Sequence, residues 1–202
     1  KNPASIRDRC RSAYCWLGFP LQIACENLYI SHDIIKCLVE ESEYHEGLFQ
    51  KDQSGFFPIH RICAEYPMNR QPDRNWKEER IKILKYLVEV EPYQLCMRAK
   101  NGSLPLHVAI ACQCPEFCRV LIAATPDLSK AHMKANGSYK TVLQDALELN
   151  RLKHVRVILE YDEDGASRPL ISSTYDNYLP LHFAARRLDR GSSCDREDVA
   201  AT

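Results

Sequence analysis

The sequence predicts an all-α solenoid of helix-turn-helix units with short β-hairpin-type loops between them. Two observations support this prediction. A short motif recurs along the chain, and the sequence at and after its copies has the pattern of two short helices. The motif reads FPLQIAC, FPIHRIC, LPLHVAI, TVLQDAL and LPLHFAA, beginning at residues 19, 57, 104, 141 and 179, at intervals of 38, 47, 37 and 38 residues. Because two short helices cannot bury both of their faces alone, neighbouring units must stack.

The units are expected to share one order of elements. Turn-rich residues come first, and a proline usually stands where a first helix of about eight residues begins, because its fixed φ and missing N–H suit that position. A loop and a second helix follow, with apolar residues at helical spacing. The predicted second helices are DIIKCLVEE (33–41), ERIKILKYLVEV (79–90), PEFCRVLIAA (115–124) and LKHVRVILEY (152–161). The Asn-Gly pairs at Asn101 and Asn136 predict tight turns rather than glycosylation sites.

Composition narrows the function. The chain has 202 residues, 45% of them hydrophobic, and its formal net charge is zero. The length and the hydrophobic fraction suit a packed core. The absence of a net positive charge argues against a nucleic-acid partner. No apolar run reaches the roughly 18 residues of a membrane span. Ten cysteines occur, but the opening KNPASIRDRC has no signal-peptide core. We therefore expect reduced core thiols in an intracellular protein, with the cytoplasm favoured over the nucleus.

The motif resembles the Thr-Pro-Leu-His-x-Ala signature of ankyrin repeats. The segments LPLHVA at 104–109 and LPLHFA at 179–184 match it best, whereas Gln22 and Gln144 replace the histidine. Asn150 stands where the family usually has a helix-ending glycine. The resemblance covers residues 17–202 and implies repeats at 17–54, 55–101, 102–138 and 139–176, with a partial repeat at 177–202. Residues 1–16 would be the end of an upstream repeat or a linker.

The 47-residue interval contains an insertion, AEYPMNRQPDRNW, at 64–76. Its Tyr66, Met68 and Trp76 have two interpretations, because such side chains favour interfaces but also pack against their own repeat. The following NWKEERIK, at 75–82, is interpreted as a solvated helix start whose glutamates complement the helix dipole.

A second feature combines His107 with Cys112, Cys114 and Cys118. These residues can be drawn as a metal or redox site, although Cys-x-Cys-x3-Cys is not the usual zinc spacing. His60 and His182 stand at the same motif position without such cysteines. The resemblance therefore implies that His107 binds backbone and ties the hairpin to the helix. We expect core thiols with one exposed thiol in the turn.

Other sequence patterns give weaker evidence of a chemical site. EYDEDGASRPLI, at 160–171, resembles half of a calcium loop but has Ile171 at the twelfth place, where a carboxylate is needed. No phosphate-binding loop, dinucleotide fingerprint or nucleophile elbow occurs. The sequence thus offers no catalytic residue, no cofactor site and no metal ligand set.

The resemblance also implies a binding surface, since ankyrin proteins bind partners with hairpin tips and the exposed face of the first helix. By register, the candidate partner-binding residues are Glu26, Asn27, Phe56, Glu65, Tyr139, Lys140, Glu148, Tyr175, Tyr178, Arg186 and Arg187. This series runs from acidic to basic, with Glu148 interrupting it, so a partner of opposite polarity is expected.

The favoured function is non-enzymatic recognition of another protein by a scaffold or targeting module. Two alternatives stay open. The repeats could select the substrate of a longer enzyme, such as a kinase or ubiquitin ligase, or the cysteines could form a metal- or redox-responsive module.

Overall fold

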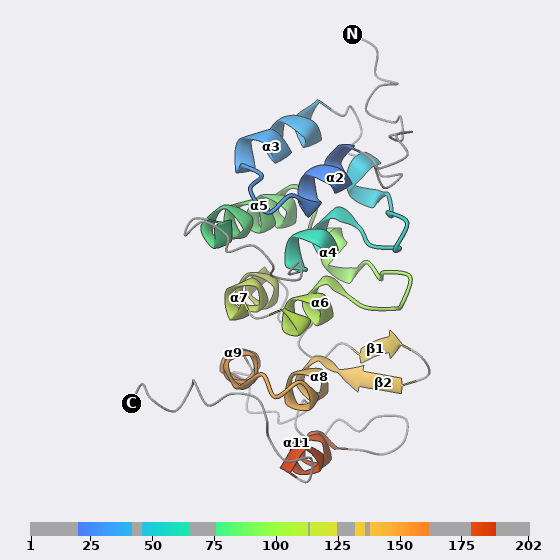
Figure 1. Ribbon diagram of the computed structural model, residues 1–202, viewed down its shortest axis with the longest axis vertical. Helices are drawn as coiled ribbons and strands as arrows, with labels where there is room; N and C mark the ends of the chain where they lie inside the picture. The colour runs from blue at the N-terminus through green and yellow to red at the C-terminus, as the bar shows by residue number, and fades with distance from the viewer. Residues whose placement is uncertain are drawn as a thin grey trace.

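The computed structural model describes residues 20–41, 46–64, 76–112, 114–124, 132–135, 138–161 and 179–188. Within them the helices stand in two columns (Figure 1). First helices form one column: α2 Pro20–Glu26, α4 Pro58–Cys63, α6 Pro105–Ala111, α8 Val142–Glu148 and α11 Pro180–Leu188. Second helices form the other: α3 His32–Glu40, α5 Trp76–Val90, α7 Pro115–Ala124 and α9 Leu152–Glu160. Helices of successive units pack against each other within each column, which confirms the predicted all-α solenoid.

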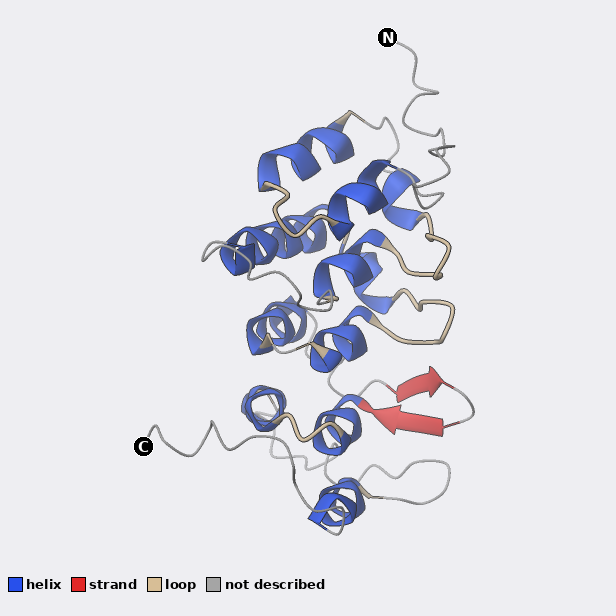
Figure 2. Cartoon of the chain, viewed as in Figure 1, coloured by secondary structure: helices blue, strands red, loops and turns tan. Residues whose placement is uncertain are grey.

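Loops and short elements join the columns. Two 3-10 helices, Glu46–Phe49 and Pro92–Cys96, lead toward the hairpins. The loops at 50–56 and 97–103 project on the same side as the antiparallel strands β1 His132–Ala135 and β2 Ser138–Thr141 (Figure 2). The hairpins therefore form a row along one side of the first-helix column.

The first two hairpins close through the same backbone geometry. The Gly55 N–H donates to the Asp52 carbonyl at 3.0 Å, and the Gly102 N–H donates to the Ala99 carbonyl at 2.9 Å. Both glycines have positive φ, +79° and +83°, a region that glycine enters without steric cost. The turn predicted at Asn101 is confirmed. Ala135 and Ser138 pair across the third hairpin, and the residues between them lie outside the described part.

Proline begins most of the first helices, as predicted. In α4 and α6 it follows an extended residue, Phe57 or Leu104, that has no capping side chain. In α6 and α11 the third helical residue supplies the cap instead. In α6 the Leu104 N–H donates to His107 Nδ1 at 3.3 Å, and in α11 the Leu179 N–H donates to His182 Nδ1 at 2.8 Å. The histidine's expected role in holding the helix start is confirmed.

Helix α8 reaches the same result without proline or histidine. The Thr141 N–H donates to Gln144 Oε1 at 2.7 Å, and the Gln144 N–H donates to Thr141 Oγ1 at 3.2 Å. This reciprocal pair is a capping box, which satisfies two backbone donors at a helix start. At the other end, Asn150 adopts a left-handed φ of 55°, as expected from its place in the motif.

The start of α5 decides between the two interpretations of Trp76. Trp76 is the first residue of this helix and is only 8% exposed, so it packs in the core, as the second interpretation has it, and does not favour an interface. Arg80, assigned to a solvated helix start, is 1% exposed, so that interpretation is wrong for this residue. Tyr66, Met68 and residues 1–16 lie outside the described residues.

The core runs through both columns as one cluster. Leu106 and Ala109 are fully buried, as the register predicts. In the described part of the chain, no helix has the length and apolar character needed to cross a membrane.

Candidate partner-binding surface

The side of the first-helix column next to the hairpins carries four of the predicted partner-binding residues, Glu26, Phe56, Lys140 and Glu148. Its side chains come from the residue two places before each helix, the fourth helical residue and the helix end. We call this surface the first-helix strip, and its described members are Ile23, Glu26, Phe56, Arg61, Val108, Ala111, Lys140, Asp145, Glu148 and Phe183. Cys63 and Ser103 stand at matching places but are buried.

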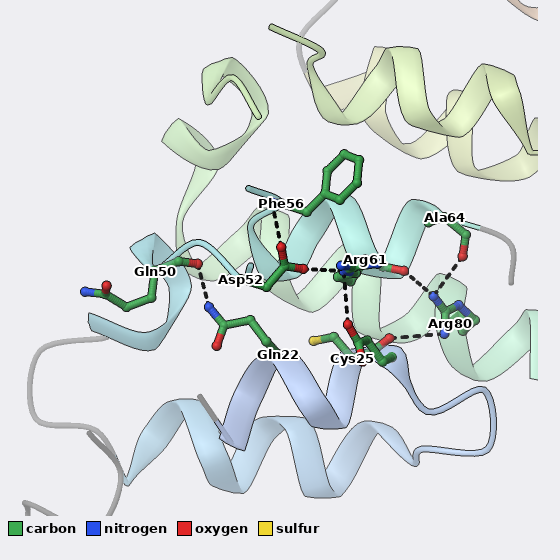
Figure 3. A network of polar contacts seen from close by, with 9 residues as sticks. Gln22, Cys25, Gln50, Asp52, Phe56, Arg61, Ala64 and Arg80 are labelled. Atoms are coloured by element: carbon green, nitrogen blue, oxygen red, sulfur yellow. Dashed lines mark hydrogen bonds and ion pairs between the residues drawn. The ribbon is translucent and has the colours of Figure 1, made fainter. Parts of the chain in front are cut away.

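An ion-pair cluster spans the first two repeats (Figure 3). The Arg61 guanidinium contacts the carboxylate of Asp52 and lies 3.2 Å from Glu26 Oε1, so α4 is bound both to its own hairpin and to α2. Its central carbon lies 5.1 Å from the centroid of the Phe56 ring. The Phe56 N–H donates to Asp52 Oδ1 at 3.0 Å. Glu26 and Phe56, both predicted from register, thus belong to one cluster.

A second cluster lies two repeats further along. The Lys140 ammonium contacts the carboxylate of Glu148 and lies 5.8 Å from the centroid of the Phe183 ring. Burial raises the pKa of the Asp145 carboxyl to about 6; nearby Lys140 opposes this shift and Glu148 adds to it. Each cluster therefore combines two carboxylates, one cation and one phenyl ring.

The repeat between the clusters contributes no charge to the strip. At the matching places α6 has Val108, which is partly buried, and Ala111, which is exposed. In the described strip, one uncharged repeat therefore lies between the two charged clusters, and Glu26 and Lys140 are both paired within the chain.

The structure describes the other predicted partner-binding residues to different extents. Asn27 is exposed, and its Oδ1 accepts from the Tyr29 N–H at 3.0 Å. Tyr139 lies on β2 opposite Lys134, and Arg186 and Arg187 lie in α11, but the side chains of these three are not described. Glu65, Tyr175 and Tyr178 lie outside the described residues. The proposed change from acidic to basic thus stays a prediction.

Register could have found the residues that the sequence analysis missed. The fourth residue of each first helix gives the series Ile23, Arg61, Val108, Asp145 and Phe183. Comparing this column directly would have placed Arg61, Asp145 and Phe183 on the strip. Asp52 gave no such signal, because its role depends on the fold of its hairpin.

Behind the first cluster, Arg80 joins two helix ends (Figure 3). Its guanidinium donates to the carbonyl of Ile62 at 2.9 Å and that of Ala64 at 3.3 Å, and it also reaches the Arg61 carbonyl. A further bond of 3.4 Å goes to the Cys25 carbonyl near the end of α2. Arg80 therefore holds the first two repeats in a fixed relation beneath the strip.

The cysteines near α7 form no exposed site. Cys112 is 3% exposed, while Cys114 and Cys118 are fully buried, so the expected exposed thiol is wrong. The physical reason is local bonding: Cys112 Sγ donates to the Ala109 carbonyl at 2.9 Å, and Cys114 Sγ to Glu116 Oε2 at 3.1 Å. Burial, together with the bond to Glu116, raises the pKa of Cys114 to about 12. Among the described residues, no three His, Cys, Asp or Glu side chains are placed to hold a metal.

Stacked helix pairs with a row of hairpins define a helical-repeat solenoid. The family model for ankyrin repeats, in three copies, matches residues 76–169. Residues 76–169 thus consist of ankyrin repeats, and the described residues have the ankyrin-repeat fold. Ankyrin repeats are generally protein–protein interaction modules.

A solved structure shares the fold. The crystal structure of the ankyrin repeat domain of Bcl-3, described as a unique member of the IkappaB protein family, aligns with a TM-score of 0.63 and 22% sequence identity. The alignment covers 84% of this chain and 64% of that chain. At this identity the likeness concerns the fold. No curated protein sequence matches the chain.

Proposed function

We propose that this chain is a non-enzymatic recognition module that binds another protein along the first-helix strip and the neighbouring hairpins. The observation that carries the proposal is the register of the strip. The first helices of successive repeats stand in one column beside the hairpins (Figure 1), and contacts join Glu26 to Arg61 and Lys140 to Phe183 across repeats. The chain would act as a scaffold or targeting module without a cofactor.

The two ion-pair clusters support this proposal because they hold polar groups in place before a partner arrives. Arg61 is 13% exposed, so its rotamer is already restricted by Asp52 and Glu26. Ordering side chains on binding costs about 0.5–1.5 kcal/mol for each flexible side chain, and prior ordering reduces that cost.

The proposal includes an intracellular location, in the cytoplasm or the nucleus. The seven cysteines in the described residues are all free thiols, and five of them are buried. Free thiols are typical of reducing compartments.

Photo-crosslinking tests the proposal. A photoreactive phenylalanine analogue replaces Ala111, which is exposed on the strip, and in a control protein it replaces Glu89, which is exposed on α5. In extract from the source cells, we expect a discrete adduct from position 111 and none from position 89. Equal labelling at both positions, or none at position 111, would contradict strip binding.

The identified partner then tests polarity. Reversing the charges of Arg186 and Arg187 is expected to weaken its binding, and unchanged affinity would count against a basic end of the strip. The alternative of substrate selection within a longer enzyme uses the same surface. It is favoured if the flanking coding sequence encodes a catalytic domain and the captured protein is its substrate.

A further inference from the structure

The row of hairpins is basic although the whole chain has no net charge. Lys51, Arg98 and Lys100 are exposed on the hairpins at 50–56 and 97–103. The acidic residue in these two segments is Asp52, whose side chain is 7% exposed and is held by Arg61. The described part of the third hairpin adds Lys134 on β1 and Lys140 on β2, and contains no acid.

The backbones of the first two hairpins lie in contact. The Lys100 N–H donates to the Gly55 carbonyl at 3.0 Å, so one hairpin is bonded to the tip of the other. A Cβ atom added at Gly55 would lie 2.2 Å from the Cβ of Lys100, which shows how closely the backbones approach. Lys51, on the same hairpin as Gly55, places its ammonium 5.0 Å from the Phe57 ring centroid.

The second-helix column distributes its charges differently from the hairpins. Its exposed cations are interspersed with acids, and ion pairs join Lys36 to Glu40 at 3.8 Å, Lys82 to Glu79 at 2.7 Å and Arg119 to Glu160 at 2.8 Å. The two hairpins at 50–56 and 97–103 thus carry three exposed cations and one held acid, whereas exposed cations and acids alternate along the second helices. Lys140, on the third hairpin, is paired with Glu148. Composition cannot reveal such segregation, because it sums over the whole surface.

We propose that the hairpin row binds an acidic segment of the partner protein. This inference rests on the proposed function and adds the chemistry of the partner. Complementary charge across an interface speeds encounter and suppresses wrong partners.

The neighbouring strip favours a peptide over a nucleic acid. Glu26, Asp145 and Glu148 border the hairpins with carboxyl groups. A duplex carries a negative charge about every 1.7 Å along its axis, so it would meet those carboxylates as well as the cations. A peptide can place its acids at the hairpins and uncharged side chains over Val108 and Ala111.

The test uses the full chain and a short fluorescent peptide of alternating glutamate and alanine, followed by fluorescence anisotropy. We expect binding at low salt that weakens as salt rises, and no binding of the matching lysine–alanine peptide. The variant K51E/R98E/K100E should lose at least about tenfold in affinity. The control K36E/K85E/R156E changes net charge equally on the second-helix column and should stay within about twofold.

Several outcomes would overturn the inference. They are absent binding of the glutamate peptide, equal loss in both triple variants, or a labelled oligonucleotide that displaces the peptide and depends on the same three cations. The neutral variant K51Q/K100Q, with a thermal unfolding midpoint matched to the wild type, separates charge from misfolding. It should also bind more weakly, and unchanged affinity would count against the proposal.

Failure here is distinguishable from failure of the proposed function. If the glutamate peptide does not bind but position 111 still forms its adduct, the acidic partner is rejected and protein recognition stands. If position 111 forms no adduct, recognition along the strip is itself rejected.

Discussion

Arg80 carries its charge inside the solenoid, where its hydrogen-bond partners are backbone carbonyls. The last carbonyls of a helix have no partner within the helix and carry partial negative charge. Arg80 reaches such groups near the ends of both α2 and α4. Burial lowers its pKa, yet a guanidinium remains protonated across the accessible pH range. It thus acts as a permanent cap for two helices.

Replacing this residue tests that role. Arg80→Met should lower the free energy of unfolding by about 3 kcal/mol, because buried carbonyls lose their donors. Arg80→Lys should be intermediate, since one ammonium cannot span both helix ends. Lys85→Met, exposed on the same helix, should stay within about 0.5 kcal/mol of the wild type. Urea unfolding measures all three, and equal stability of the two methionine variants would refute the cap.

Asp145 shows how burial in the first-helix column sets the titration of a residue. Removal of the carboxyl from water raises the pKa of Asp145 to about 6. A raised pKa means that the folded state binds a proton more tightly than the unfolded chain. The contribution of Asp145 to stability is therefore present at low pH and is lost as pH rises through about 6.

Asp145→Asn should accordingly be more stable than the wild type at pH 7, by about 2 kcal/mol, and equal to it below about pH 4. His60 titrates with opposite sign in the same range, because burial lowers its pKa to about 4. The informative quantity is thus the difference between the two proteins, measured by urea unfolding across pH. Asp33→Asn, at a carboxyl that is 96% exposed, should show no such difference. A constant difference at every pH would contradict the assignment.

At the scale of the element, one backbone need is met by different side chains. Each first helix begins with an N–H that requires an acceptor, and His107, His182 and Gln144 supply it from the same helical position. That position also reaches the following repeat: His60 Nε2 lies 3.1 Å from the Ser103 carbonyl, and Gln22 Nε2 donates to the Gln50 carbonyl at 2.6 Å. Histidine and glutamine share an acceptor and a donor at similar reach, which explains the substitution between repeats.

This interchange can be tested in α8. Gln144→His should stay within about 0.5 kcal/mol of the wild-type stability, because the imidazole can accept from the Thr141 N–H. Gln144→Leu should lose about 1–2 kcal/mol, since it leaves that fully buried donor unpaired. Thermal or urea unfolding compares them. Equal losses in both variants would show that shape, not hydrogen bonding, governs the position.

The helix order was predictable because proline, turn residues and apolar spacing act locally. The helix-end role of Asn150 and the capping role of His107 followed from the motif register in the same way. The start of α5 was not predictable, since Trp76 is separated by an irregular insertion from the previous repeat. The burial of Arg80 was not predicted either, and the reason is physical. A charged residue is expected to be solvated unless its long-range carbonyl partners are known.

The sequence register predicted which helix positions Glu26 and Lys140 occupy, but it did not predict what their side chains contact. Register put Glu26 and Lys140 on one strip, while their pairing with Arg61 and Glu148 depends on how neighbouring elements pack. At the scale of the whole molecule, the neutral composition hid a basic hairpin row beside a strip of paired charges. Charge balance in a sequence excludes a uniformly charged surface but not a locally charged one.

Burial in the shared core also determines how reactive the cysteines are. Cys25, Cys63, Cys112, Cys114 and Cys118 are buried in one hydrophobic cluster, whereas Cys37 and Cys96 are exposed. Only thiolates react readily. Burial raises the pKa of Cys63, Cys114 and Cys118, and it raises that of Cys25 to about 12. We therefore expect alkylating reagent to modify Cys37 and Cys96 in the native protein and to reach the other five on unfolding. The five should become reactive together along a denaturant series, because they share one cooperative core.

Peptide mass spectrometry after pulsed labelling gives the rate of modification of each cysteine. Native labelling of Cys112 or Cys114 as fast as Cys96, or stoichiometric zinc in the purified protein, would restore the redox or metal alternative, since both require thiols that open without unfolding the repeats around them.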